Sequence, residues 1–286
     1  MDPLIALEDV DFGATGTFPM YQYRQAQFNQ LCLGANSTHQ DATGLRVYAG
    51  AHVLARFLGS TPGRALLHDA RLVELGCGTG AVGSVTAVTA SVKKLLVTDG
   101  DARAVALAQR NVQHTVHAAK PALDTSASQL LWGPGPSTVG DFDIVIGCEL
   151  MYYKTNLDAL LATVLALVDA ANGLFLHAHL FRKDEHDADM TAFLTKAGWA
   201  TLAVPVPSFV PYEEMRLWPN WLNTCCLVSG PKARIAALAI AHPKWRPFVD
   251  VATTLELNER AADAQEAAEA TASDTDSDDG VGGLFG

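Results

Sequence analysis

A run of alternating glycines directly after a short apolar segment carries the strongest chemical signal in the sequence. The segment 72–75 is apolar apart from Glu74, and three glycines follow: Gly76, Gly78 and Gly80. Glycine lets the backbone turn sharply and approach a ligand without a Cβ in the way. Asp99 closes the next apolar run, where a carboxylate can accept hydrogen bonds from ribose hydroxyls. The spacing indicates a nucleotide-like cofactor bound across two strand ends.

Two classes of cofactor compete for this loop. Gly78, Gly80 and Gly83, followed by a later acid, also match the dinucleotide fingerprint. However, a dinucleotide places an anionic pyrophosphate at the helix amino end, and the acid Glu74 just before the glycines would repel it. S-adenosylmethionine carries a sulfonium and an ammonium, which carboxylates near the loop stabilise. The residues favour the methyl donor and leave a dinucleotide or a purely structural turn as alternatives.

Several segments in order resemble the successive motifs of class I methyltransferases, and within that class the methyltransferase-16 family of small protein-lysine methyltransferases. They are Gly44–Leu54, Glu74–Gly80, Val97–Asp101, Asn111, Trp132-Gly133 and Phe142–Tyr152. The resemblance covers about residues 40–230. Three positions differ from the family: Tyr48 stands in place of a Trp, Leu131 in place of an acid, and Glu149 in place of an Asp.

The resemblance implies an α/β fold, with a Rossmann-like, mainly parallel seven-strand sheet and helices on both faces. It implies S-adenosylmethionine as the cofactor and Trp132 beside the adenine, although burial habits alone would also explain Trp132 as a core aromatic. The cofactor-binding residues that it implies are Tyr48, Glu74, Gly76, Gly78, Gly80, Asp99, Trp132 and Cys148.

Glu149 and Tyr152 are the catalytic candidates that the resemblance implies. Methyl transfer needs a neutral nitrogen about 3 Å from the methyl carbon, whereas free lysine has a pKa of about 10.4. A carboxylate beside the amine favours its charged form, so Glu149 would capture and aim the amine, and the neighbouring sulfonium would favour proton release. Tyr152 would supply a wall and an acceptor. The structural alternative is that Glu149 caps the helix that follows it.

A pair of histidines offers an alternative chemistry. His177 and His179 are two apart on an expected strand and share a face, with Asp184 and His186 close behind. This pattern suggests a metal site, but the spacing matches no hydrolase motif. We expect no metal and treat these histidines as strand and loop residues.

The order of apolar runs predicts alternating strands and helices from about residue 45. Expected strands are 71–75, 95–98, 129–132, 142–147, 174–180, 199–205 and 224–229. We expect a hairpin or cap within residues 1–40, from the run 21–33, a methyltransferase domain over 41–255, and an acidic, disordered tail over 256–286. That tail would serve partner choice rather than folding.

Charge is concentrated at one end of the chain. Residues 256–286 hold nine acids against Arg260, a net charge of −8, which leaves −3 of the total −11 for the rest. A nearly neutral body with an acidic end argues against broad binding of nucleic acid or a membrane and makes a basic partner more plausible. We also expect a protein substrate and a monomer. The five cysteines show no disulfide or zinc pattern, and the first twelve residues lack the features of a signal peptide. A cytoplasmic location fits, and the nucleus also does.

The family resemblance implies N-methylation of a lysine in a non-histone protein. The segment Phe209–Glu214 resembles a part of the lysine methyltransferases that modify elongation factor 2, which implies a translation factor as substrate. Because the cofactor half of such a fold does not reveal the acceptor, a small-molecule N-methyltransferase and a non-catalytic binding module stay open as alternatives.

Overall fold

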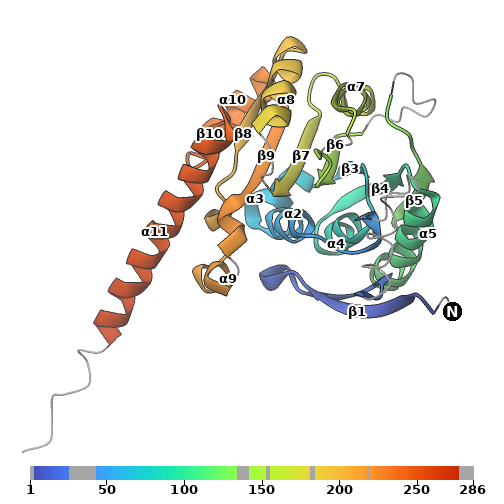
Figure 1. Ribbon diagram of the computed structural model, residues 1–286, viewed down its shortest axis with the longest axis horizontal. Helices are drawn as coiled ribbons and strands as arrows, with labels where there is room; N and C mark the ends of the chain where they lie inside the picture. Colours follow the sequence, from blue (N-terminus) through green and yellow to red (C-terminus); the bar gives the residue numbers. More distant parts are fainter. Residues whose placement is uncertain are drawn as a thin grey trace, which may run out of the picture.

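The computed structural model describes residues 3–25, 43–133, 142–152, 155–180, 184–217 and 219–276. Its first element is an antiparallel hairpin of β1 (Ile5–Asp11) and β2 (Thr17–Tyr23), joined by the short 3₁₀ turn η1 (Gly13–Thr15). The hairpin lies beneath the helices of one sheet face (Figure 1). The sequence predicted a hairpin from the run 21–33, but the chain forms it earlier, and residues 26–33 lie outside the described residues.

An eight-stranded sheet forms the centre of the molecule, in the order β10-β8-β9-β7-β6-β3-β4-β5. The five strands from β7 to β5 run parallel, and β9, β8 and β10 complete the sheet in antiparallel pairs. The strands are β3 (Ala70–Glu74), β4 (Val92–Asp99), β5 (Asp124–Gln129), β6 (Ile144–Cys148), β7 (Leu174–Leu180), β8 (Trp199–Ala203), β9 (Thr224–Pro231) and β10 (Arg246–Pro247). The predicted seven-strand, mainly parallel sheet is confirmed, with the two-residue β10 added at one edge.

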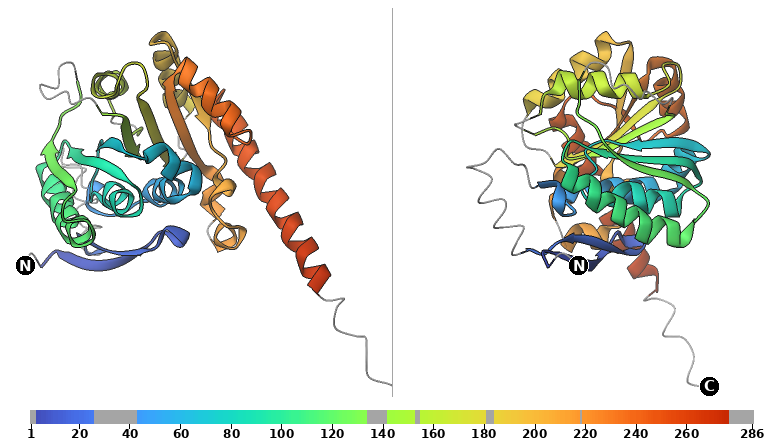
Figure 2. Two further views of the ribbon diagram at one scale, coloured as in Figure 1. Left: turned by 180° about the vertical axis from the view of Figure 1, so that it is seen from behind. Right: turned by 90° about the vertical axis from the view of Figure 1, so that its right-hand side faces the viewer.

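Helices cover both faces of the sheet (Figure 2). On one face lie α2 (Ala49–Gly59), α4 (Ala81–Thr89) and α5 (Ala102–Asn111), which continues through a π-helical turn, η4 (Val112–Val116), into α6 (His117–Ala119). On the other lie α7 (Leu157–Leu167) and α8 (Asp184–Lys196). The remaining helical segments are η3 (Thr43–Leu45), α3 (Thr61–Leu67), η5 (Val206–Ser208), α9 (Tyr212–Leu217), η6 (Pro219–Asn223), α10 (Lys232–Ala241) and α11 (Val251–Asp276). Among the described helices, none is long and apolar enough to cross a membrane.

Strand periodicity explains the two cores. Successive side chains of a strand point to opposite faces, so Leu174 and Leu176 join the core under α2 and α4, while Phe175 joins the core under α7 and α8. Both faces of β7 are buried, and its sequence is accordingly apolar apart from His177 and His179. Two-sided burial is why the sequence located this strand correctly from end to end.

The edge strand β5 lies earlier in the chain than the sequence predicted. The apolar residues 129–132 suggested a strand there, but β5 spans Asp124–Gln129, and its residues are polar and mostly exposed. Pairing with β4 alone, it has little apolar area to bury and so little hydrophobic signal. Trp132 therefore follows the strand and lies at its carboxyl end.

The connections of the parallel strands leave the sheet centre in two directions. From β3 the chain moves to β4 and β5 on one side, then crosses to β6 and β7 on the other. In open α/β sheets, ligands bind outside the carboxyl ends of the strands at such a reversal. The last residues of three strands around this point are Glu74, Asp99 and Cys148. The predicted site residues therefore gather at the carboxyl ends of the parallel strands.

The expectation of a disordered tail is wrong for residues 256–276. These residues belong to α11, which begins at Val251 and projects from the sheet as a long helix (Figure 1). Alanine and glutamate, which dominate the segment, are strong helix formers. The first turns of α11 also pack against the protein, with Val251, Thr254, Asn258 and Ala262 buried. The helix thus starts on a tertiary contact and continues by propensity.

Asn258 fixes α11 to the connection between β8 and β9. Its Oδ1 accepts from the amide of Val206 at 2.9 Å, and its Nδ2 donates to the carbonyl oxygens of Leu222 and Thr224, both at 3.1 Å. The side chain is fully buried. One amide group therefore satisfies three backbone groups at both ends of the same connection.

We predict that Asn258→Ala lowers the free energy of unfolding by about 2–3 kcal/mol, because three buried backbone groups lose their partner. Urea unfolding followed by circular dichroism measures the change. Asn172→Ala, at an exposed turn, is the matched control and should stay within about 0.5 kcal/mol of wild type. An equally small change for Asn258→Ala would contradict the anchoring role.

Candidate active site

The glycine loop adopts a backbone that requires glycine. Gly76, Gly78 and Gly80 have φ angles of 55°, 53° and 68°, in the left-handed region that favours glycine. A Cβ on Gly78 would lie 2.5 Å from the carbonyl oxygen of Gly44. A Cβ on Gly76 would lie 2.6 Å from Leu150 Cδ2 and 3.4 Å from the Trp132 ring. The loop is therefore packed between η3 on one side and the residues after β5 and β6 on the other.

Glu74 serves the helix that follows the loop. Its Oε2 accepts from the amide of Gly83 at 2.9 Å, the third residue of α4, whose N-cap is Gly80 and so has no capping side chain. The carboxyl group is completely buried, and this burial raises the pKa of Glu74 to about 8, with a further increase from Asp99, against the opposing effect of the Gly83 amide. Glu74 thus caps α4 from the neighbouring strand, a role that the sequence analysis did not assign.

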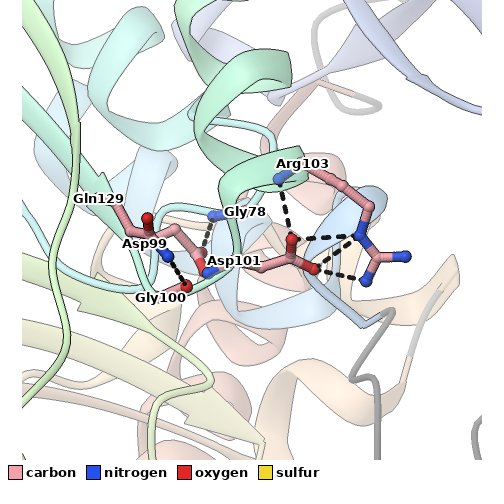
Figure 3. A network of polar contacts seen from close by, with 6 residues as sticks. All are labelled: Gly78, Asp99, Gly100, Asp101, Arg103 and Gln129. Carbon is pink, nitrogen blue, oxygen red and sulfur yellow. Dashed lines mark hydrogen bonds and ion pairs between the residues drawn. The ribbon is translucent and has the colours of Figure 1, made fainter. Parts of the chain in front are cut away.

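Asp99 ties the glycine loop to the start of α5 (Figure 3). Its Oδ2 accepts from the amide of Gly78 and its Oδ1 from that of Asp101, both at 2.9 Å. Burial raises the pKa of Asp99, while these amide bonds act in the opposite direction. Gln129 Nε2 donates to the carbonyl oxygen of Gly100 at 2.8 Å and holds the next residue in place. Because a carboxylate offers about four acceptor positions, Asp99 can still accept from ligand hydroxyls.

Asn111 joins the loop to the N-terminal hairpin. Its Nδ2 donates to the carbonyl oxygens of Thr79 (2.8 Å) and Tyr21 (2.9 Å), and its Oδ1 accepts from the Tyr21 amide at 2.6 Å. The side chain is fully buried. In the sequence, only the family resemblance marks Asn111, because no local pattern shows that a strand 90 residues earlier is its partner.

Three further predicted cofactor residues lie around the loop. Trp132 is half-buried against the second core and borders Gly76. Tyr48 is the N-cap residue of α2 and packs in a small cluster with Leu45 and the first turns of α5. Cys148 ends β6, and burial raises the pKa of its thiol well above the ordinary value, so it is no reactive thiolate. The structure brings these residues to one edge of the sheet.

Glu149 occupies a strained position between two elements. Its φ is 55°, an uncommon value for a residue with a side chain. Its Oε1 accepts from the amide of Gly50, in the first turn of α2, and from that of Leu180, at the end of β7, both at 3.0 Å. A helix amino end favours negative charge. Glu149 caps a helix, as the structural alternative stated, but that helix is α2, whereas Asn156 caps the following α7.

Gly50 is required by the Glu149 carboxylate that lies against it. A Cβ on Gly50 would lie 2.7 Å from Glu149 Oε1 and 3.0 Å from the carbonyl oxygen of Ala178. Only glycine leaves room for the carboxylate at the end of α2. Its own backbone does not need positive φ, so nothing local in the sequence indicates this requirement.

Tyr152 lies in a tight turn after β6. The Thr155 hydroxyl accepts from the Tyr152 amide at 3.2 Å and donates to the carbonyl oxygen of Leu150 at 2.6 Å, and the Thr155 amide donates to the Tyr152 carbonyl at 2.8 Å. Tyr152 is half-buried. Thr155 therefore holds the backbone of the catalytic candidate, close in the chain to Glu149.

The histidine pair is part of the second core. His177 stacks on Phe175 at 4.6 Å between ring centroids, and His179 stacks on His177 at 5.6 Å. His179 Nε2 lies 3.1 Å from Asp187 of α8, and the pKa of His179 rises to about 10, since contacts with Asp187 and Cys225 outweigh the opposing effect of burial. Within the described part of the chain, no group of three or more His, Cys, Asp or Glu side chains is placed to hold a metal ion.

Glu74 makes a pH-dependent contribution to stability. Because its folded pKa lies above its unfolded value, the contribution is present below about pH 4.5 and is lost as the pH rises through about 8. We predict that the wild-type protein loses on the order of 3 kcal/mol of its free energy of unfolding between about pH 5.5 and 8. Glu74→Gln, which keeps the acceptor for Gly83, should not show this loss. Urea unfolding of ligand-free protein at both values tests this, with Glu256→Gln on the exposed face of α11 as control. Parallel pH slopes for wild type and Glu74→Gln would contradict the assignment.

Comparisons with known proteins agree with this geometry. A METTL21A protein N-lysine methyltransferase of Xenopus tropicalis is 29% identical over 142 residues, covering 49% of this chain and 63% of that protein. A calmodulin-lysine N-methyltransferase of Arabidopsis thaliana is 26% identical over 204 residues, covering 67% of this chain and 66% of that protein. The chain thus spans just under two thirds of the length of these relatives.

A solved structure supports the fold. The 16S rRNA N2 G1207 methyltransferase RsmC of T. thermophilus, in complex with AdoMet and guanosine, superimposes with a TM-score of 0.51 at 12% identity, over 80% of this chain and 51% of that one. At this identity the likeness concerns the class I fold alone. The family model described as lysine methyltransferase, Methyltransf_16, matches residues 27–197, more than half of the sequence. The chain belongs to this lysine methyltransferase family.

Proposed function

We propose that this protein is an S-adenosylmethionine-dependent methyltransferase that N-methylates a lysine side chain of a protein. One observation carries the proposal: the glycine loop with Asp99 and the Glu149 carboxylate lie at the same carboxyl edge of the parallel sheet. The glycine loop with Asp99 suits a nucleoside, and the Glu149 carboxylate suits an amine. Membership in the lysine methyltransferase family supports this acceptor.

The residues around the loop fit the cofactor. The close backbone of Gly76 and Gly78 admits no side chain, and Asp99 presents a carboxyl group already oriented by two amides. Trp132 would flank the adenine, and Asp99 would accept from the ribose. When bound, S-adenosylmethionine supplies a methyl group activated by its sulfonium. The cofactor's positive charge would favour the ionised forms of Glu74 and Asp99, whose pKa values burial raises.

The substrate side of the site is built around Glu149. The amides of Gly50 and Leu180 hold its carboxylate in one orientation, so it can capture an ammonium group without losing rotamer freedom at that moment. Since a carboxylate favours the charged amine, Glu149 aims the nucleophile and does not act as its base. Tyr152, whose backbone Thr155 holds, would form a wall of the lysine pocket.

Cofactor binding provides the first test. We expect calorimetry to detect binding of S-adenosylmethionine and of its demethylated product, and we expect Asp99→Ala to weaken both at least tenfold. The loss of a charge-assisted hydrogen bond corresponds to about 1.5–3 kcal/mol. Asp124→Ala, at the opposite end of β5 and in a surface ion pair with Lys94, is the matched control. Binding of NAD in place of S-adenosylmethionine would support the dinucleotide alternative instead.

Glu149 provides the second test, because its charge and its capping role can be separated. Glu149→Gln keeps an oxygen for Gly50 and Leu180 but removes the charge. We expect it to keep the wild-type free energy of unfolding within about 1 kcal/mol and to lose methyl transfer at least tenfold. Glu149→Ala should lose both activity and about 1–3 kcal/mol of stability, since two amides lose their acceptor.

Transfer of tritiated methyl groups into lysate proteins, followed by mass spectrometry of the labelled residue, measures this activity. Glu256→Gln, on the exposed part of α11, should leave labelling unchanged. Full activity of Glu149→Gln would overturn the aiming role. Label on a small molecule, or no label despite cofactor binding, would favour the small-molecule enzyme or the binding module.

The identity of the protein substrate rests on the segment Phe209–Glu214, whose resemblance implies a translation factor. In the structure Glu214 of this segment pairs with the buried Arg56 of α2 at 2.8 Å, and Arg56 lies over the Trp221 ring at 4.9 Å. The segment is thereby held against the helix whose amino end Glu149 caps. Labelling of a translation factor in the lysate would support this substrate.

A further inference from the structure

The outer side of α5, η4 and α6 forms a cationic strip on an acidic protein. The chain has 31 Asp and Glu against 20 Lys and Arg, yet residues 102–123 contain no acid. Three of the basic groups in this stretch have local hydrogen-bonding partners: Arg103 pairs with Asp101, Lys120 donates to the carbonyl oxygens of Ala87 and Ala90, and the His117 ring lies 3.0 Å from Gln113 Oε1 and 2.5 Å from Thr125 Oγ1. Arg110 and His114 face a common hollow, which His117 also lines.

This hollow has a volume of about 710 Å³ and lies between β2 and the helical strip. No carboxylate is among its lining residues, which are Tyr21, Ala106, Gln109, Arg110, Gln113, His114, His117 and Ala118. All but Tyr21 recur at intervals of one, three or four positions, which places them on one face of the helix. The hollow therefore offers one guanidinium, two imidazoles, two side-chain amides and one phenol ring to a ligand.

Tyr21 orders the basic groups. The Arg110 guanidinium lies 3.6 Å from the centroid of the Tyr21 ring, and the His114 ring meets Tyr21 edge-on at 5.2 Å. Asn111 holds the backbone of Tyr21 and also donates to Thr79 of the glycine loop. Arg110 is thus preorganised, and the wall of the hollow is joined directly to the candidate active site.

We propose that this hollow docks an acidic segment of the protein substrate, which rests on the proposed function for the existence of such a substrate. The Arg110 guanidinium would bind a carboxylate of this segment, and His114 would offer a ring N–H beside it. Gln109 and Gln113, both exposed, present amides that can pair with the peptide backbone.

The charge of the protein favours an acidic peptide over a nucleic acid. Nucleic-acid binding needs many cations along the phosphate backbone, whereas the hollow holds one arginine and two histidines in a chain with net charge −11. The chain's own acidic helix α11 packs beside β9, near the opposite edge of the sheet from β5 and α5 (Figure 1). A separate protein segment is therefore the fitting occupant.

Binding of a fluorescein-labelled octaglutamate peptide, measured by fluorescence anisotropy, tests the proposal. The variant Gln109→Glu/Gln113→Glu adds two negative charges while leaving the stacking of Arg110 on Tyr21, and the new carboxylate at position 113 can still accept from His117 as the Gln113 amide oxygen does. We expect this variant to bind at least tenfold more weakly than wild type, and wild-type binding to weaken as NaCl rises from about 50 to 300 mM. Ala171→Glu/Asn172→Asp, at an exposed turn, adds the same charge and should bind as wild type.

Four outcomes would overturn the assignment. Equal affinity of the two double variants, or no wild-type binding at low salt, would show that the hollow docks no acidic peptide. If the wild-type protein binds an oligothymidylate of equal charge more tightly than octaglutamate, and Gln109→Glu/Gln113→Glu loses this binding, the strip is a nucleic-acid site. Self-association in sedimentation velocity that this variant abolishes would identify a second copy as the occupant. Failure of the proposed function is distinguishable, because it would appear as absent cofactor binding in calorimetry, whereas octaglutamate binding needs no activity.

Discussion

Hydrogen bonds from backbone amides to carboxyl groups at the ends of parallel strands organise this protein. At the end of β3, Glu74 accepts from Gly83 and caps α4. At the end of β4, Asp99 accepts from Gly78 and shapes the glycine loop. Just after β6, Glu149 accepts from Gly50 and caps α2. Each acid links a strand end to a different loop or helix, so the edge of the sheet and the elements above it form one unit.

The same arrangement creates an electrostatic cost that a cationic ligand can relieve. Carboxyl groups removed from water lose hydration, and the pKa values of Glu74 and Asp99 rise accordingly. Glu74 caps α4 from a buried position, where the neutral acid is the more stable form below about pH 8. A bound sulfonium nearby would shift this balance toward the carboxylate. The stability of the protein and its affinity for the proposed cofactor would therefore both depend on the same buried groups.

Peripheral elements are attached by single polar side chains with several partners. Asn111 joins the hairpin to the loop, Arg56 joins α2 to α9 and stacks on Trp221, and Asn258 joins α11 to both ends of the β8–β9 connection. All three side chains are buried. Because an unpaired polar group in such a position is costly, each residue specifies one docking geometry for its element.

The sequence by itself determined the sheet, most of its strands and the positions of the glycine loop and Asp99. Two-sided burial produces a continuous apolar run in a strand such as Ile144–Cys148, and three positive φ angles admit glycine at 76, 78 and 80 with least strain. Those signals are local, so they can be recognised without knowing the partner elements. Family resemblance, likewise local in its motifs, supplied Glu149 and Tyr152.

Only the tertiary structure decided what these acids contact and where the chain ends pack. Glu149 caps a helix that begins 100 residues earlier, and the need for Gly50 follows from that carboxylate and not from its own backbone. The polar strand β5 and the acidic helix α11 have weak hydrophobic patterns, so their order depends on pairing with β4 and on Asn258. Contacts between distant segments leave no periodicity in the chain, and for this reason the sequence could place the site but not its supports.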